Sequence, residues 1–227
     1  MSLLNLDRKT VRYNGHSVLS EVSLRIEPGE KIALIGQSGA GKSTLLELLY
    51  EQTKANASLV PQELGLVRSL SVFHNIFMGR LDRHGTWYNL ANLIKPFEAE
   101  VAQIKPIVER LGLADKLFAT IDQLSGGQQQ RTAIGRALHK GSDIFFGDEP
   151  VSALDVSIRA QILNLLRDLQ NRFQLTYMFI SHDLSVVKHF CDRTCVLYLG
   201  KIVEIADSEL LYREPLHPYT QALIEAI

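Results

Sequence analysis

One glycine-rich segment, residues 36–44, constrains the fold of this chain more than any other. It reads GQSGAGKST and fits the pattern G-x-x-x-x-G-K-[ST]. The short apolar run 31–35 before it predicts a buried strand, and the leucine-rich segment 42–50 after it predicts a helix. Such a turn lets successive backbone N–H groups face one anion, and the helix N-terminus adds partial positive charge. The segment therefore predicts a phosphate-binding loop.

The side chains of this loop suit a nucleoside triphosphate with its Mg²⁺ ion. We expect Lys42 to reach the β- and γ-phosphates of ATP and Ser43 to bind Mg²⁺ through its hydroxyl. The loop residues expected to contact the nucleotide are Gly36, Ser38, Gly39, Ala40, Gly41, Lys42, Ser43 and Thr44.

A pair of carboxylates follows a second apolar run, residues 144–146. Two adjacent acids at the end of a buried strand are costly to desolvate unless a cation lies nearby. We expect Asp148 to hold Mg²⁺, and Glu149, which points elsewhere, to polarise an attacking water.

Composition excludes several classes of protein. Of the 227 residues, 46% are hydrophobic, which argues against a disordered chain. The 24 Lys and Arg nearly balance the 25 Asp and Glu, which argues against a protein whose main function is to coat nucleic acid. Two cysteines, Cys191 and Cys195, are too few for a disulfide framework or a zinc site. The length suits a single domain over residues 1–227. With no apolar run near roughly 18 residues and no leader pattern, we expect a cytosolic protein held at any membrane by something else.

Apolar patterning predicts an α/β fold. Apolar and polar residues alternate over residues 11–26, around Asn14-Gly15, which indicates antiparallel strands joined by a turn. Residues 64–122 instead predict a mostly helical lobe. Strands alternate with helices elsewhere and predict a largely parallel sheet covered on both faces. The strands are expected at 31–35, 144–146, 176–180 and 194–199, and the helices at 42–50, 128–139, 158–173 and 184–190.

The segment Leu124-Ser125-Gly126-Gly127-Gln128-Gln129, joined to the two motifs above, resembles the signature of the ATP-binding cassette (ABC) ATPases. The resemblance extends over nearly the whole chain. It implies a P-loop NTPase fold of ABC type, with a mostly parallel core, an antiparallel lobe and an inserted helical lobe, and the hydrolysis of ATP to ADP and phosphate. In that family two ATPase domains pair head to tail, so that Ser125, Gly126, Gly127 and Gln128 would contact the ATP bound by the partner.

The resemblance assigns further roles. Tyr13 matches the aromatic residue that stacks on adenine, and Gln62 matches the glutamine that senses Mg²⁺ and water. Asp155, in the segment 152–155, matches the loop that couples the two sites, and His182 matches the switch histidine that contacts the γ-phosphate. The implied catalytic set is thus Glu149, His182, Gln62 and Lys42, and the implied metal set is Ser43, Gln62 and Asp148.

The sequence departs from the family pattern in two places. Gly147 stands where the family has an apolar residue, so we expect lost packing, a looser strand end and lower stability with activity retained. Only 17 residues, 45–61, separate Thr44 from Gln62. We therefore expect a reduced antiparallel lobe that rests on residues 2–27 and a strand near 58–60, and a displaced Gln62.

Different parts of the chain resemble different subfamilies of ABC ATPases. Residues 151–227, which include Leu216-His217-Pro218-Tyr219-Thr220, are similar to ATPases of peptide and nickel importers, and residues 71–90 resemble those of phosphonate importers. This implies a motor at the cytoplasmic face of the cell membrane. Its partners would be a second ATPase subunit in a homo- or heterodimer, transmembrane permease subunits and a solute-binding protein, with no nucleic acid. A soluble or regulatory ABC ATPase is the alternative.

Two roles are possible for Trp87, which stands beside Tyr88. It is either a docking anchor for a partner or a packing residue inside the helical lobe.

Overall fold

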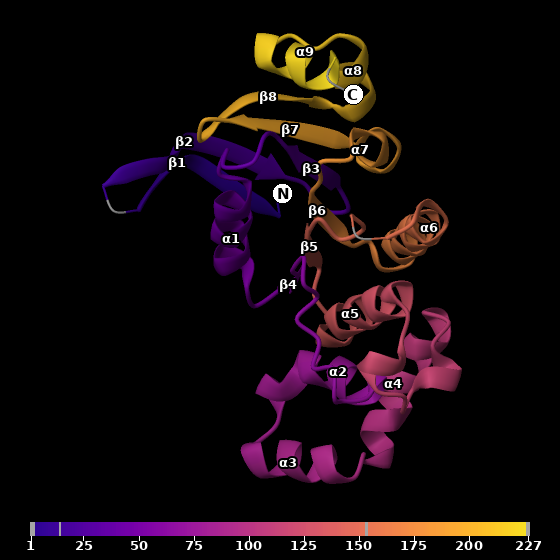
Figure 1. Ribbon diagram of the computed structural model, residues 1–227. Coiled ribbons are helices and arrows are strands. Elements are labelled where there is room, and N and C mark those ends of the chain that lie inside the picture. The colour runs from indigo at the N-terminus through magenta and orange to yellow at the C-terminus, as the bar shows by residue number, and fades with distance from the viewer. Residues whose placement is uncertain (1–2, 14, 153, 226–227) are drawn as a thin grey trace.

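The computed structural model describes residues 3–13, 15–152 and 154–225 (Figure 1). Asn14 of the expected hairpin turn and Ala153 of the expected coupling loop lie outside the described residues.

A mixed sheet forms the centre of the molecule. Within the described ranges it has six strands in the order β4-β5-β6-β3-β7-β8. The neighbours from β4 to β7 pair in parallel, and β8 pairs with β7 in antiparallel fashion. The bounds are β3 Lys31–Ile35, β4 Ala57–Val60, β5 Ile144–Asp148, β6 Thr176–Ile180, β7 Arg193–Tyr198 and β8 Lys201–Asp207. The expected parallel sheet is confirmed.

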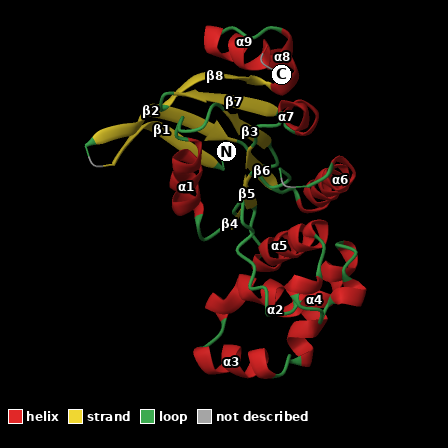
Figure 2. Ribbon diagram, in the orientation of Figure 1, coloured by secondary structure: helices red, strands yellow, loops and turns green. Residues whose placement is uncertain are grey.

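Helices cover both faces of this sheet, with α1 (Lys42–Thr53) on one side and α6 (Val156–Phe173) and α7 (Leu184–Phe190) on the other (Figure 2). Alternate residues of β3 divide between two cores, since Ile32 and Leu34 pack with α1 whereas Ala33 and Ile35 pack with the helices opposite. A sheet buried on both faces accounts for the unbroken apolar runs in its strands.

The antiparallel lobe is a hairpin of β1 (Leu4–Tyr13) and β2 (His16–Ile26), which is the whole of the second sheet among the described residues. It joins the main sheet where the Ser20 amide donates to the Gly200 carbonyl oxygen at 2.8 Å. The expectation that a strand near 58–60 belongs to this lobe is wrong. That strand is β4, which pairs in parallel with β5 at the edge of the main sheet, because Ala57 and Val60 are buried there and the strand contacts α1 and α5.

The inserted lobe is helical, as expected. It contains α2 (Val72–Phe77), α3 (Thr86–Ile94) and α4 (Glu98–Arg110), with 3₁₀ turns at Met78–Arg83, Ala114–Lys116 and Ile121–Gln123. α5 (Gly126–Lys140) returns the chain to the sheet, and Figure 1 shows α5 between the lobe and β5. Phe73, Ile76 and Val108 of the lobe share one apolar cluster with α5.

Three elements after β7 were not predicted. A tight turn at Leu199-Gly200 leads into β8, followed by α8 (Ser208–Arg213) and α9 (Pro218–Glu225). The Asp207 carboxylate caps α8 by accepting from the amides of Glu209 and Leu210. Both helices lie at the end of the molecule opposite the helical lobe (Figure 1).

Gly147 is tightly packed, contrary to expectation. A Cβ atom at this position would lie 2.6 Å from Cδ1 of Phe179 and 2.9 Å from Cγ of Pro150. The expectation of lost packing is wrong because the Phe179 ring on the neighbouring strand occupies the space that a side chain would fill.

We predict that Gly147→Ala destabilises the protein by about 1–3 kcal/mol, the usual cost of overpacking a core. Urea unfolding measures the change. Phe179→Leu should relieve part of it, so that the double variant loses less stability than the two single changes together. Additive losses would show that the Phe179 ring is not the obstacle.

Candidate active site

A cavity of about 750 Å³ lies at the carboxyl ends of β3, β5 and β6. In an open parallel sheet this edge is where ligands bind. The structure brings most of the residues predicted from sequence into its wall: Gly36, Ser38, Gly39, Gly41, Lys42, Ser43, Thr44, Gln62, Asp148, Glu149 and His182.

The loop between β3 and α1 is shaped by close backbone contact. Gly36 has φ of 145°, and a Cβ there would lie 2.2 Å from the Leu197 carbonyl oxygen of β7. The loop therefore requires glycine at its first position. Ala40 is buried and lies outside the cavity wall, and its amide donates to the Gln37 carbonyl oxygen at 3.2 Å.

Lys42 begins α1 and directs its ammonium group back across the loop. Nζ donates to the Gly36 carbonyl oxygen at 2.8 Å and to the Gln37 carbonyl oxygen at 2.9 Å. Burial lowers the pKa of Lys42, and the charges of Glu149 and Asp148 offset part of this. The first amides of α1 have no partner within the helix, so a cation and several N–H donors meet where a phosphate would bind.

Asp148 ends β5 beside Ser43. Burial raises the pKa of Asp148, as does the Glu149 charge, while the Lys42 charge and the Ser43 hydroxyl act in the opposite direction. A carboxylate disfavoured in its ionised form and a neighbouring hydroxyl are oxygen donors that suit Mg²⁺. In the described part of the chain, no three His, Cys, Asp or Glu side chains form a metal cluster. An ion held by Asp148 and Ser43 could take further oxygen ligands from a nucleotide.

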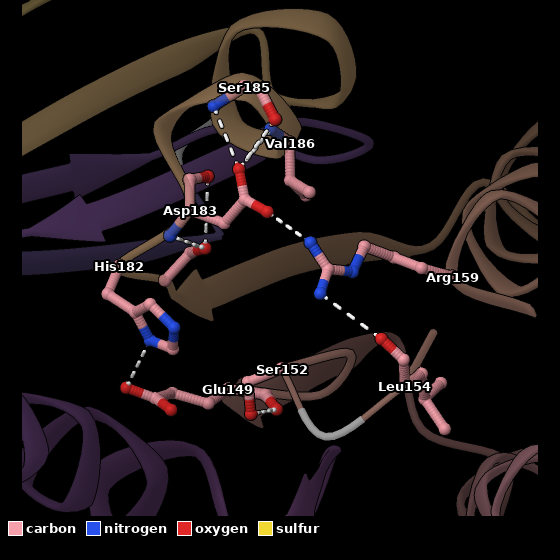
Figure 3. A network of polar contacts seen from close by, with 9 residues as sticks. Glu149, Ser152, Leu154, Arg159, His182, Asp183, Ser185 and Val186 are labelled. Carbon is pink, nitrogen blue, oxygen red and sulfur yellow. Dashed lines mark hydrogen bonds and ion pairs between the residues drawn. The ribbon is translucent and has the colours of Figure 1, made fainter. Parts of the chain in front are cut away.

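Glu149 and His182 face each other across the cavity (Figure 3). The Glu149 Oε1 atom lies 2.9 Å from Nδ1 of His182. Glu149 has φ of 49°, an uncommon conformation for a residue with a side chain. Its amide donates to the Ile180 carbonyl oxygen at 3.1 Å, and its carbonyl oxygen accepts from the Ser152 hydroxyl at 3.0 Å. The backbone after β5 is thus fixed on both sides of a strained residue.

A polar network that the sequence analysis missed supports His182. The Asp183 carboxylate pairs with Arg159 of α6, and Arg159 donates to the Leu154 carbonyl oxygen at 3.2 Å (Figure 3). Asp183 also accepts from the Ser185 hydroxyl at 2.6 Å. Burial alone would raise the pKa of Asp183. The hydrogen bonds from Ser185 and Val186 and the Arg159 charge outweigh burial, so the pKa lies below its ordinary value. The sequence signal that could have revealed this network is Asp183, an acidic residue at the N-cap of α7.

Gln62 lies in the cavity wall despite the short segment before it. β4 pairs in register with β5, so that Val60 lies opposite Gly147 and the chain leaves β4 beside Asp148. Arg136 of α5 holds the next turn through the carbonyl oxygens of Leu64 and Gly65. The register of β4, rather than the length of the preceding segment, thus places Gln62 at the cavity.

The remaining predicted residues lie outside this cavity. Tyr13 is 57% exposed at the end of β1, and Val18 of β2 lines the cavity instead. Ser125 caps α5, accepting from the Gln128 amide at 3.4 Å, and Asp155 caps α6. The residues that are absent from the wall are Tyr13, Ala40, Ser125, Gly126, Gly127, Gln128 and Asp155. Leu223 of α9 also lines the cavity and was not predicted.

Comparison with known proteins identifies the family. Residues 19–152 match the family model described as ABC transporter. A putative peptide import ATP-binding protein of Brucella ovis is 42% identical over 229 residues, covering 92% of this chain and 72% of that protein. The oligopeptide transport ATP-binding protein AppF of Bacillus subtilis is 39% identical over 226 residues, covering 91% and 69%.

Solved structures show the same fold. An ATP-binding cassette of an ABC transporter in its ADP conformation has a TM-score of 0.85 at 21% identity and covers 100% of both chains. CbiO1 of Clostridium perfringens has a TM-score of 0.80 at 21% identity, covering 94% of this chain and 91% of that one. The predicted P-loop NTPase fold of ABC type is confirmed.

This chain therefore belongs to the ABC transporter family. It is an ATP-binding ATPase subunit of that family, as the sequence motifs implied. Among residues 3–13, 15–152 and 154–225, every helix is too short or too polar to cross a bilayer.

We predict that Lys42→Ala weakens ATP binding by roughly 10- to 100-fold, the worth of a hydrogen bond to a charged group. Titration of the purified protein with a fluorescent ATP analogue measures the affinity. Lys54→Ala is the matched control, because this exposed lysine pairs with Glu51 outside the cavity. Equal affinity in the Lys42 variant would contradict the role of this loop.

Proposed function

We propose that the chain is the ATP-hydrolysing motor of an ABC importer for peptide-like solutes. The observation that carries the proposal is that the residues expected to contact the nucleotide lie in two separate places on the chain. The phosphate loop, Asp148, Glu149 and His182 line one cavity, whereas the segment 125–128 lies outside it. On this proposal each chain holds part of the site, and a second subunit would supply the donors of residues 125–128.

The segment 125–128 is suited to complete that site. Ser125 and Gly126 are exposed, so a hydroxyl and a backbone without side chain are accessible at the N-terminus of the 15-residue helix α5. Helix N-termini of this kind bind anions. In the proposed dimer this end of α5 would meet the γ-phosphate of the ATP held by the partner, and Asp155, at the start of α6, would lie at the contact between subunits.

The residues of the cavity divide the catalytic work. Lys42 and the first amides of α1 would bind the phosphates and neutralise charge on the transferred group. Glu149 would orient a water for in-line attack, and His182, 2.9 Å from Glu149, would hold that carboxylate and contact the γ-phosphate. Gln62 would sense the occupied site from the end of β4. Tyr13, exposed at the hairpin, would stack on adenine.

Mg²⁺ would be held by Ser43 and Asp148, with Gln62 nearby, and when bound it supplies charge neutralisation for the phosphates. Burial and the Glu149 charge raise the pKa of Asp148, and a cation bound beside Ser43 would offset this by favouring the ionised carboxylate.

The helical lobe offers a surface for permease subunits. Of the residues in α3, all of which the structure describes, Asn92 alone is buried. Trp87 is 84% exposed and Ile94 is 80% exposed, which rules out internal packing for Trp87. Exposed apolar side chains gathered on one helix are typical of an interaction surface. Docking through this lobe would hold the motor at the cytoplasmic face of the membrane.

A peptide-like solute is favoured over a phosphonate-like one. The relatives from Brucella ovis and Bacillus subtilis are a peptide and an oligopeptide transport protein, and they align with 92% and 91% of this chain. Alignments of that extent include the helical lobe, where the sequence resembled phosphonate importers. A solute-binding protein would deliver the solute to the permease.

We predict that Glu149→Gln slows ATP hydrolysis by roughly 10²–10⁴-fold, the usual contribution of a general base, while ATP still binds. The trapped nucleotide should then hold two chains together. Solution mass measured by light scattering, with and without ATP and Mg²⁺, should show an ATP-dependent dimer.

Ser125→Arg in the Glu149→Gln background tests the shared site. This bulky cation should abolish the dimer and leave ATP binding by the monomer intact. Asn171→Arg, an exposed position near the C-terminal end of α6, is the matched control and should leave the ATP-dependent dimer intact. A normal ATP-bound dimer in the Ser125→Arg variant, or a monomer that binds ATP in every variant, would contradict the proposed assembly of two copies of this chain.

A further inference from the structure

The chain after β8 returns to the phosphate loop. Figure 1 shows α9 beside β7 and β8. The Tyr219 hydroxyl accepts a hydrogen bond from the Gln37 amide at 2.8 Å, and Leu223, one turn further along α9, lines the nucleotide cavity. Helix α9 thus contacts the loop that begins the site.

The peptide group between Gly36 and Gln37 connects Tyr219 with Lys42. Its N–H group, on Gln37, donates to Tyr219, and its carbonyl oxygen, on Gly36, accepts from Lys42 Nζ at 2.8 Å. A peptide group is planar, so its N–H and C=O directions are fixed relative to each other. Fixing the N–H with Tyr219 therefore also fixes the carbonyl that holds the lysine.

Several contacts hold Tyr219 in this place. Its ring stacks on Tyr198 at the end of β7, with ring centroids 4.1 Å apart. The Glu204 carboxylate of β8 accepts from the amides of Leu216 and His217 at 2.9 and 3.0 Å and so fixes the turn into α9. The hydroxyl is thus supported by two strands of the main sheet.

We infer that Tyr219 is a positioning residue of the ATPase: its hydroxyl orients the Gly36–Gln37 peptide and thereby sets the position of the Lys42 ammonium group for the nucleotide phosphates. The inference rests on the proposed role of Lys42. It makes the segment after β8 part of the nucleotide site, so that displacement of α9 would weaken nucleotide binding.

The test is Tyr219→Phe in the full chain, which removes the hydroxyl and keeps the stacked ring. We expect ATP and ADP to bind roughly 2- to 10-fold more weakly, the worth of one neutral hydrogen bond. KM for ATP should rise more than kcat falls. In the nucleotide-free protein, amide hydrogen exchange at Gln37, followed by NMR, should become faster because the N–H loses its acceptor.

Two matched variants separate positioning from general stability. Tyr177→Phe removes a hydroxyl that donates to the Leu166 carbonyl oxygen, also at 2.8 Å, inside the core away from the cavity. It should lower Tm and leave ATP affinity and Gln37 exchange unchanged. Tyr198→Phe keeps the ring that stacks on Tyr219 and should change neither ATP affinity nor Gln37 exchange.

The outcomes are distinct. Unchanged ATP affinity or unchanged Gln37 exchange in Tyr219→Phe, with ATP bound normally by the wild type, would overturn the inference and leave the proposed function in place. Failure of the wild-type chain to bind ATP would instead contradict the proposed function.

Discussion

The register of the parallel strands is the constraint on which this structure depends. Asp148 lies opposite Ile180 across β5 and β6, and Leu34 of β3 lies opposite the same residue on its other side. All three strands therefore end at one edge, where the phosphate loop, Asp148 with Glu149, and His182 lie together. A slip of one residue would exchange the two apolar cores and displace these loops together, so core packing and site geometry are maintained by the same pairing.

Much of the fold and of the cavity could be predicted from the sequence because both depend on local signals. Apolar runs marked the strands, and glycine spacing before Lys42 marked the loop. What could not be predicted depends on contacts between distant segments. The close fit of Phe179 against Gly147 and the pairing of β4 with β5 require the assembled sheet.

The same limit applies to the supporting residues of the site. Asp183 and Arg159 are 24 residues apart, and Tyr219 bonds to a residue 182 positions away. Neither pair produces a periodic pattern or a motif with a known role. Motif spacing marked the loop residues expected to contact phosphate, whereas Asp183, Arg159 and Tyr219 were found only when the fold brought their elements together.

The cap of α5 has a consequence for the proposed ATP-bound dimer. The Ser125 oxygen accepts from the Gln128 amide, and Gln128 returns the contact by accepting from the Ser125 amide at 3.0 Å. A serine hydroxyl that accepts one hydrogen bond still has its own proton to donate. The free subunit therefore already holds the Ser125 oxygen in place. In the proposed dimer the side chain would lose little conformational entropy on meeting a partner's phosphate, and this would favour pairing.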